Sequence, residues 1–461
     1  MKLVILHTND IHSRYENFAK AATILKQRKD DQTLILEGGD FADFRAIELQ
    51  GTKGEAALQL LEHTGYDALT IGNNETFNGM DTLEHMTRTT RVPFISNNLS
   101  KLDRTAIEGV CPSIIVEKSR VRILITGSSP DLGGFNEGLG LHVEDYKKAL
   151  RSTLDEREGQ YDLCLVLSHV GTEADAEIAE AFDEVGVIIS AHDHQLYAEA
   201  KVIHGSINHS AGSFAEHVGV VEVEKTSDGW QLVHSEVLPT EHAQPDPDTL
   251  HLLKQSKEVA ISNLRQPLFS LEHPLWHDVV EENPLTNLIA DGLFDWLDCD
   301  FAIINSGIAN AGLFDFVSRK KLIEVCPSPL NPTTFEVKGE DIKQALEESL
   351  DAQVCLADGK GPGFRGKFVG SLHVAGAEVV HDGKAIQHVA IQGAPLEDDR
   401  WYTVGSSDYL HRGSGYPSLA NNRNESYRPE EIKDVIEKYA QKKEFVERAH
   451  DKRVMLEGVK P

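Results

Sequence analysis

Residues 3–12 read LVILHTNDIH, a short apolar run followed at once by side chains that can bind a metal ion. The pattern of an apolar run before a polar turn recurs along the first half of the chain. The runs occupy residues 3–6, 34–36, 68–71, 163–167 and 185–189, and amphipathic stretches such as 18–28, 55–63 and 173–182 separate them. Buried strands that alternate with helices predict a layered α/β domain, which we place at residues 1–240.

The polar residues after these runs form one candidate site, because ligands of an open α/β sheet bind at the carboxyl ends of its strands. The five strand ends would bring together Asp10, His12, Asp40, Asn73, His169, His192 and His194. Oxygen and imidazole ligands without thiolates suit Mn, Zn, Co, Fe or Ni, and seven ligands exceed what one tetrahedral ion needs. Each residue alone is more typical of a hydrogen-bonded turn, but five such strand ends together favour a two-metal site. We expect Asp10-x-His12 and His192-x-His194 each to present two side chains on one face of an extended turn.

The second half of the chain differs in pattern. Residues 239–247 are rich in proline and acidic side chains, and we interpret residues 241–262 as a linker that contains a helix. Residues 263–461 form a second domain. It has predicted helices at 284–297, 340–349 and 430–439, and strands at 301–305, near 367–372, at 378–380 and at 402–406.

Five blocks resemble the motifs of calcineurin-like metallophosphoesterases: His7-Thr-Asn-Asp10-Ile-His12, Gly38-Gly39-Asp40, Gly72-Asn73-x-Glu75, Ser168-His169-x-Gly171 and His192-x-His194. With its second domain, the chain resembles the 5′-nucleotidase family, which includes UDP-sugar hydrolases and 2′,3′-cyclic-nucleotide phosphodiesterases. The resemblance implies a layered α/β/β/α metallophosphoesterase sandwich followed by a mixed α+β 5′-nucleotidase C-terminal domain. It also implies two divalent ions, with Mn as first choice and Zn, Co, Fe, Ni or Mg as alternatives. Asp40 would bridge them, with Asp10, His12 and His194 on one ion and Asn73, His169 and His192 on the other.

One departure from the family concerns catalysis. The family usually reads Gly-Asn-His-Glu, and its histidine contacts the phosphate, whereas this chain has Asn74 at that position. We assign Asn73 and Asn74 as the catalytic residues. An asparagine can donate a hydrogen bond to a phosphoryl oxygen but cannot carry a proton to a leaving group. The sequence therefore predicts slow turnover or leaving groups that need little protonation.

Further departures concern the substrate pocket. The family's substrate-binding arginine is missing at residues 308–310, and Leu330 replaces a phenylalanine. Tyr409 lies near the position of a base-stacking aromatic residue, although a half-buried strand tyrosine explains it equally well. The candidate substrate-binding residues are Tyr409, Phe364, Arg365, Arg412 and Asn331. Residues 361–367 superficially fit phosphate-binding glycine motifs but lack the required context. A solvated turn is the ordinary explanation of this stretch, and a loop that places Phe364 and Arg365 near a ligand is the alternative.

The composition of the chain argues against several classes of binding partner. Lys and Arg number 45 against 74 Asp and Glu, a formal net charge of −29, which argues against nucleic-acid polymers and anionic membranes as partners. The sequence has no apolar run of about 20 residues, and its five cysteines form no Cys-x-x-Cys motif, so we expect a cytoplasmic protein without membrane or protein partners.

The expected activity is metal-dependent hydrolysis of a nucleotide phosphate ester by a bridging hydroxide. The alternatives are a 2′,3′-cyclic-nucleotide phosphodiesterase, a sugar-nucleotide pyrophosphatase, or a weakly active metal-containing protein that binds a nucleotide.

Overall fold

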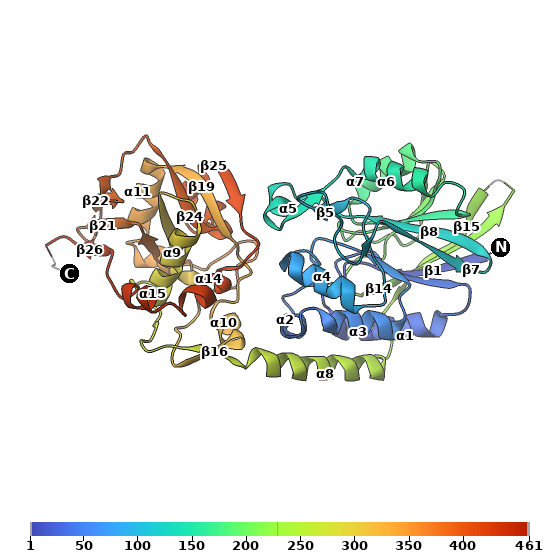
Figure 1. Cartoon of the computed structure of the whole chain (residues 1–461), viewed down its shortest axis with the longest axis horizontal. Coiled ribbons are helices and arrows are strands. Elements are labelled where there is room, and N and C mark those ends of the chain that lie inside the picture. The colour runs from blue at the N-terminus through green and yellow to red at the C-terminus, as the bar shows by residue number, and fades with distance from the viewer. Residues whose placement is uncertain (1, 228, 459–461) are drawn as a thin grey trace. The chain divides into compact units, whose positions relative to one another are not determined.

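The computed structural model describes residues 2–227 and 229–458 (Figure 1). Contacts divide the chain into two compact units, Met1–Asn263 and Leu264–Pro461. Across the described residues, no helix combines the length and apolar character that crossing a membrane requires.

The first unit is built on two large sheets. Its strands are β1 (Lys2–Thr8), β2 (Thr33–Glu37), β3 (Ala68–Thr70), β4 (Phe94–Ile95), β5 (Leu99–Lys101), β6 (Val110–Cys111), β7 (Ser113–Lys118), β8 (Val121–Ser128), β9 (Leu141–Val143), β10 (Leu163–Ser168), β11 (Val185–Ser190), β12 (Lys201–Ile203), β13 (Ser206–His209), β14 (His217–Thr226) and β15 (Gly229–Pro239). One sheet has the order β15-β14-β1-β2-β3-β4-β6 and the other β12-β13-β11-β10-β8-β7. The central strands β1, β2 and β3, and likewise β8, β10 and β11, run parallel, so their carboxyl ends lie at common edges.

The helices of this unit are α1 (Tyr15–Arg28), α2 (Ile47–Thr52), α3 (Glu55–Thr64), α4 (Gly79–Thr89), α5 (Gly134–Gly138), α6 (Tyr146–Glu156), α7 (Thr172–Ala181) and α8 (Pro247–Leu264). Alternate residues of β1 face opposite layers. Leu3 and Ile5 join the core between the sheets, whereas Leu6 joins the core that includes Phe18 of α1. A third core contains Leu150 of α6. Figure 1 shows α1 and α3 on one side of the sheets and α6 and α7 on the other, which confirms the predicted α/β/β/α sandwich.

Helix α8 covers most of the predicted linker. Its buried residues Thr249, Leu253, Ser256 and Ala260 recur every three or four positions and form one helix face. Leu253 joins the core of the first unit, and Ala260 packs against Gly51 of α2. The helix therefore packs along the first unit, and the two compact units divide near its end.

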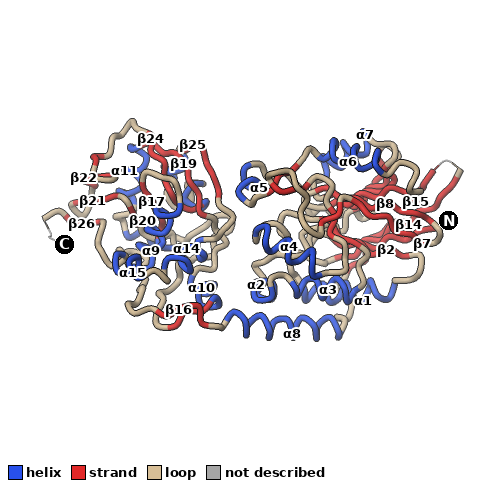
Figure 2. Tube along the Cα trace, viewed as in Figure 1, coloured by secondary structure: helices blue, strands red, loops and turns tan. Residues whose placement is uncertain are grey.

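The second unit mixes sheets and helices. Its strands are β16 (Pro267–Ser270), β17 (Phe301–Asn305), β18 (Phe316–Ser318), β19 (Pro332–Lys338), β20 (Leu372–Ala375), β21 (Ala377–His381), β22 (Ile386–Ile391), β23 (Ala394–Pro395), β24 (Trp401–Ser407), β25 (Asn422–Tyr427) and β26 (Val454–Leu456). Its helices are α9 (Pro284–Trp296), η1 (Ser306–Ile308), α10 (Arg319–Val325), α11 (Gly339–Glu348), α12 (Ala352–Cys355), α13 (Asp408–His411), η2 (Pro417–Ala420), α14 (Ile432–Tyr439) and α15 (Lys443–Arg448). Figure 2 shows these helices and strands interspersed, as expected for an α+β domain.

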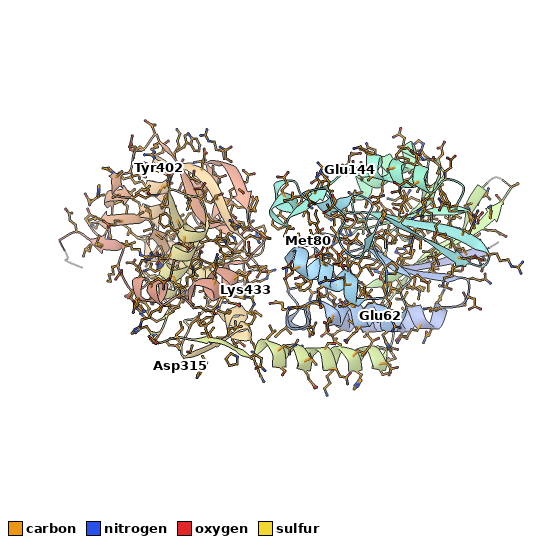
Figure 3. The ribbon with its side chains drawn as sticks, viewed as in Figure 1. Glu62, Met80, Glu144, Asp315, Tyr402 and Lys433 are labelled. Atoms are coloured by element: carbon orange, nitrogen blue, oxygen red, sulfur yellow. The ribbon has the colours of Figure 1, made fainter. Side chains whose placement is uncertain are left out.

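The hydrophobic core of the second unit surrounds α9. Asn283 caps this helix by accepting a hydrogen bond from the Thr286 amide, and Pro284 occupies its first turn. The main sheet has the order β20-β17-β24-β19-β25. Tyr402 of β24, labelled in Figure 3, is buried in this core.

The strand predicted near residues 367–372 is wrong. The segment is a loop up to Ser371, and β20 begins at Leu372. Its backbone amides do not pair with one strand, because those of Val369, Gly370 and Ser371 donate to the carbonyls of Ala357, Cys355 and Val279. Regular pairing with β17 begins at Leu372.

Candidate metal centre

The turns after β1 and β2 lie side by side. The Asp10 amide donates to the Gly39 carbonyl at 2.9 Å, and the His12 amide donates to the Asp40 carbonyl at 2.8 Å. A Cβ atom at Gly39, whose φ is +97°, would lie 2.6 Å from Nδ1 of His169. Glycine is thus required where the turns approach the site, which explains the Gly-Gly-Asp block.

Two overlapping groups of ligand atoms converge at these strand ends. The ligand atoms of Asp10, His12 and His194 lie within 4.8 Å of one another, and so do those of Asp10, Asp40 and His169. The Nε2 atoms of His12 and His194 are 3.0 Å apart, and Nε2 of His169 lies 3.4 Å from Oδ1 of Asp40. Asp10 belongs to both groups, so this chain supplies two adjacent sets of three ligands.

His169 is oriented as a metal ligand. Its Nδ1–H donates to the Gly38 carbonyl at 2.8 Å, which leaves Nε2 as the free nitrogen. That Nε2 atom is buried and has no hydrogen-bond partner. Burial alone lowers the pKa of His169, but the nearby carboxylates of Asp40 and Asp10 outweigh it and raise this pKa to about 10. Ionised carboxylates that face an unpartnered imidazole nitrogen are a donor set that fits a divalent cation.

The backbone of the ligand turns is strained. Five of the expected ligands are non-glycine residues with left-handed φ: Asp10 (53°), His12 (48°), Asp40 (57°), His192 (79°) and His194 (55°). The predicted extended turns are therefore wrong. Such conformations cost on the order of 1–3 kcal/mol each and persist where the site demands them.

The remaining two expected ligands lie outside both three-ligand groups. The ring of His192 is 5.1 Å from that of His169, and its backbone amide donates to the Asp10 carboxylate at 3.1 Å. Oδ1 of Asn73 is buried without a hydrogen-bond partner. A buried unpaired acceptor is costly, and a metal ion would satisfy it.

Asn74 contacts the expected bridging carboxylate. Its backbone amide donates to Oδ1 of Asp40 at 2.8 Å, and its Nδ2 donates to Oδ2 at 2.7 Å. Burial opposes ionisation of Asp40, but the positive charge of the nearby His169, together with the hydrogen bond from the Asn74 amide, holds the pKa of Asp40 below its usual range. Asn74 thus fixes the orientation of this carboxylate.

In the second unit, most candidate substrate-binding residues are already engaged with the protein. The rings of Phe364 and Tyr409 stack at 4.3 Å, and Tyr409 is fully buried. Arg412 donates to Oδ2 of Asp408 at 2.8 Å, and Asn331 donates to the carbonyl of Glu430 at 3.0 Å. Arg365 is exposed. The assignment of these five residues to a substrate stays a prediction.

Two family profiles match the chain. One described as calcineurin-like phosphoesterase matches residues 3–196, and one described as 5′-nucleotidase, C-terminal domain, matches residues 263–421. The chain belongs to the 5′-nucleotidase family. It is a metallophosphoesterase, with candidate ligand groups for divalent metals.

Known members of this family align along most of the chain. The uncharacterized metallophosphoesterase YunD of Bacillus subtilis is 28% identical, covering 94% of this chain and 98% of YunD. The 5′-nucleotidase of Mus musculus is 24% identical, covering 89% of this chain and 83% of the mouse protein. Among solved structures, the NAD nucleotidase NadN of Haemophilus influenzae has a TM-score of 0.68 at 16% identity, over 99% of this chain and 97% of NadN. The NadN likeness shows a common two-domain fold.

The sequence did not single out three residues that hold the ligand turns or contact the ligand side chains. Glu75 accepts hydrogen bonds from the amides of Gly72 and Asp40 at 2.9 and 3.0 Å and so joins two ligand turns. Asp193 accepts from the Thr172 amide at 2.6 Å and ties the histidine turn to α7. The ring of Phe214 packs beside the rings of both His12 and His194. Glu75 and Asp193 stand inside the quoted blocks and could have been found there, whereas nothing local marks Phe214.

Proposed function

We propose that the chain hydrolyses a phosphate ester of a nucleotide at the first unit's metal centre. The observation that carries this proposal is the pair of ligand groups that share Asp10, with Nε2 of His169 buried and unpartnered between two carboxylates. When bound there, two divalent ions would supply an activated water and charge stabilisation for phosphoryl displacement.

The chain's own residues prepare the site for those ions. Burial lowers the pKa of His12 and of His192, so both imidazoles are neutral, as metal ligands must be, at neutral pH. The Gly38 carbonyl fixes the tautomer of His169. Asn74 holds both oxygens of Asp40 through its amide groups. His12 and His192 therefore need no change of protonation state to bind a metal ion, whereas His169 must release a proton.

Asn74 also bears on the substrate. Its carboxamide donates to Asp40 and has no proton to give to a leaving oxygen. Alkoxide leaving groups of nucleoside monophosphates must then be protonated by solvent. This single observation favours a second candidate, hydrolysis of a sugar-nucleotide pyrophosphate, because its phosphate leaving group needs little protonation.

The names of similar proteins support a nucleotide as substrate. The mouse relative is named a 5′-nucleotidase, and the Haemophilus influenzae neighbour is named an NAD nucleotidase. Cyclic 2′,3′-nucleotides remain a further alternative on the family resemblance alone.

The test is release of phosphate or nucleoside from mononucleotides, cyclic nucleotides and sugar nucleotides, with and without Mn. Asp40→Asn is the decisive variant, and Asp131→Asn, at an exposed position, is its control. We expect metal-dependent turnover that Asp40→Asn lowers at least a thousandfold and Asp131→Asn leaves unchanged. Absence of turnover on every substrate, with two ions bound per chain, would instead indicate a metal-containing nucleotide-binding protein.

A further inference from the structure

Arg14 lies in the first unit, in the turn that joins β1 to α1. It follows the expected ligand His12 by two residues, and its backbone amide donates to the Ile11 carbonyl at 3.0 Å. Its side chain is exposed, and Cζ of the guanidinium lies 5.5 Å from the centre of the Phe214 ring. The chemistry proposed for the metal centre leaves this cation without a role.

The ring of Phe214 links Arg14 to two of the expected ligands. Its centre lies 5.7 Å from that of the His12 ring and 5.4 Å from that of the His194 ring. A guanidinium within about 6 Å of an aromatic centre is attracted to the face of the ring. One half-buried phenylalanine therefore holds the cation beside the metal centre.

The backbone of Phe214 has an unfavourable conformation. Its φ is +59°, a left-handed value that is exceptional for an aromatic residue. The Phe214 amide donates to the Asp10 carbonyl at 2.8 Å, and the Phe214 carbonyl accepts from Nδ2 of Asn17, in α1, at 3.1 Å. Strained residues persist where the surrounding structure fixes them, and they cluster at functional sites. The aromatic ring is thus preorganised as a support for Arg14.

The protein does not neutralise the charge of Arg14. Among the described residues, no acidic side chain forms an ion pair with this guanidinium, whereas Arg45, which follows β2, lies 3.6 Å from Asp43. A guanidinium that rests on an aromatic face keeps its N–H donors available to an anion. In a chain whose formal net charge is −29, an unpaired arginine beside a metal centre is a candidate contact for an anionic ligand.

The position of Arg14 suits an outer part of the substrate. Asp10 belongs to both ligand groups, so a phosphoryl group held by two ions lies near that shared carboxylate. Arg14 instead packs on Phe214, which is a neighbour of His12 and His194 and not itself a ligand. The guanidinium is therefore one side chain further out than the reacting phosphoryl group would be.

The chemistry at position 74 makes a cation at this place useful. Asn74 cannot give a proton to a leaving oxygen. A phosphate leaving group needs little protonation but departs with negative charge, and an arginine fork can bind two oxygens of such a group.

We propose that Arg14, supported by the Phe214 ring, binds the phosphate group next to the one that reacts. This proposal rests on the proposed function and narrows its substrate class to compounds with two adjacent phosphates. Arg14 is then a substrate-binding residue that selects for the second phosphate, and Phe214 is a positioning residue that acts through Arg14.

Binding of non-hydrolysable anions tests Arg14 directly. The metal-loaded full chain is titrated calorimetrically with methylenediphosphonate, which has two adjacent anionic groups, and with methylphosphonate, which has one. Arg14→Ala is expected to weaken the binding of methylenediphosphonate at least tenfold and that of methylphosphonate less than twofold. Arg45→Ala, which removes another exposed arginine close to a ligand turn, is the matched control and should weaken either anion less than twofold.

Two results of these titrations would overturn the proposal. Equal losses for the two anions in Arg14→Ala would place the arginine on the reacting group. Equal losses in Arg14→Ala and Arg45→Ala would show that general charge, and not a contact, attracts the anion. A metal content and an unfolding temperature equal to those of the parent exclude lost ions and misfolding as causes.

A Phe214→Leu background tests the support of the guanidinium. Leucine keeps an apolar contact with the ligand histidines but removes the aromatic face. In this background Arg14→Ala should weaken methylenediphosphonate binding less than threefold, because the two residues act as a unit. An undiminished tenfold loss would overturn the positioning role of Phe214.

Kinetics separates this proposal from the proposed function. The metal-loaded chain is assayed with a sugar nucleotide and with p-nitrophenyl phosphate, which has a single phosphate. We expect Arg14→Ala to lower kcat/KM at least tenfold for the sugar nucleotide and less than twofold for p-nitrophenyl phosphate. Turnover with an unchanged ratio of the two kcat/KM values refutes the role of Arg14 and keeps the hydrolase. No turnover by the parent, with methylenediphosphonate binding lost in Arg14→Ala but not in Arg45→Ala, refutes the hydrolase and keeps the anion contact.

Discussion

The metal centre of the first unit and the aromatic cluster of the second unit differ in how their charged groups are paired. At the metal centre, Nε2 of His169 and Oδ1 of Asn73 are buried without partners. In the second unit, Arg412 is paired with Asp408 and Tyr409 is stacked on Phe364. An unpaired buried polar group costs about 1–3 kcal/mol, and Oη of Tyr409 is buried without a partner as well. The two regions differ in their charged groups: Arg412 is neutralised by Asp408 within the protein, whereas the first site leaves an imidazole nitrogen beside two carboxylates, where a metal ion fits.

Because of this difference, we expect substitutions in the two regions to affect different properties of the protein. Changes at the first site should alter metal binding and activity more than folding. Changes among the internally paired residues of the second unit should alter stability first. Arg365 differs from these paired residues, since its side chain is exposed and donates to the backbone carbonyl of Phe364.

Metal removal should produce the largest effect. Chelation is expected to abolish hydrolysis and to increase hydrogen exchange in the ligand turns near residues 9–13, 38–43 and 191–194, because their strained backbone loses the ion that repays its cost. Strands β17 and β24 serve as the internal control and should exchange as before. An equal increase of hydrogen exchange in both units would contradict the expectation that only the ligand turns depend on the metal.

The next largest effect is expected at a buried ion pair of the second unit. Nη2 of Arg453 donates to Oδ2 of Asp291 at 2.7 Å, and both side chains are at most 10% exposed. Arg453→Met leaves that carboxylate with only the more exposed Arg448 and should lower the free energy of unfolding by about 3 kcal/mol.

The matched control for that pair lies on the surface. Arg423 and Glu336 are 2.7 Å apart, with side chains 52% and 27% exposed. Arg423→Met should cost less than about 1 kcal/mol in urea unfolding, because water screens an exposed pair. Similar losses in both variants would show that burial does not decide the value of these pairs.

The Asn74→His variant tests whether the lack of a general acid or base at position 74 limits the rate of hydrolysis. A histidine can act as a general acid or base, a role typically worth about 10²–10⁴-fold, and Asn74 cannot. We expect kcat on a nucleoside monophosphate to rise about tenfold or more, with a smaller gain on a sugar nucleotide whose leaving group needs little protonation. Asn74→Ala is the control, and it should weaken metal binding by releasing Asp40. No gain in kcat for the histidine variant would locate the limit in the substrate pocket.

The sequence predicted the parts of the molecule that local pattern determines. Apolar runs such as 34–36 and 163–167 became buried strands. The ligand atoms of Asp40 and His169, which follow these strands, lie within 4.8 Å of each other although β2 and β10 belong to different sheets. The left-handed conformations of Asp10 and His192 could not be predicted, because they depend on contacts with turns distant in sequence. The stacking of Phe364 on Tyr409 joins residues 45 positions apart and has no local signal either. The loop before Leu372 was mistaken for a strand because the amides of Gly370 and Ser371 donate to the carbonyls of Cys355 and Val279, and the local sequence does not reveal these contacts.

Two fully buried histidines, one in each unit, extend the comparison to the dependence of stability on pH. Carboxylates raise the pKa of His169 in the first unit, whereas burial, reinforced by Arg453, lowers the pKa of His373 in the second unit to about 3. Between that value and the unfolded value of about 6.5, only the unfolded chain binds the proton, so stability falls as pH falls. From pH 7 to 5 this one group should remove about 2 kcal/mol from the unfolding free energy of the second unit.

Urea unfolding of His373→Gln should show a correspondingly shallower dependence on pH, since glutamine does not titrate. Identical pH slopes for parent and variant would mean that the folded second unit binds the proton on His373 as readily as the unfolded chain does. That result would contradict the lowered pKa of His373.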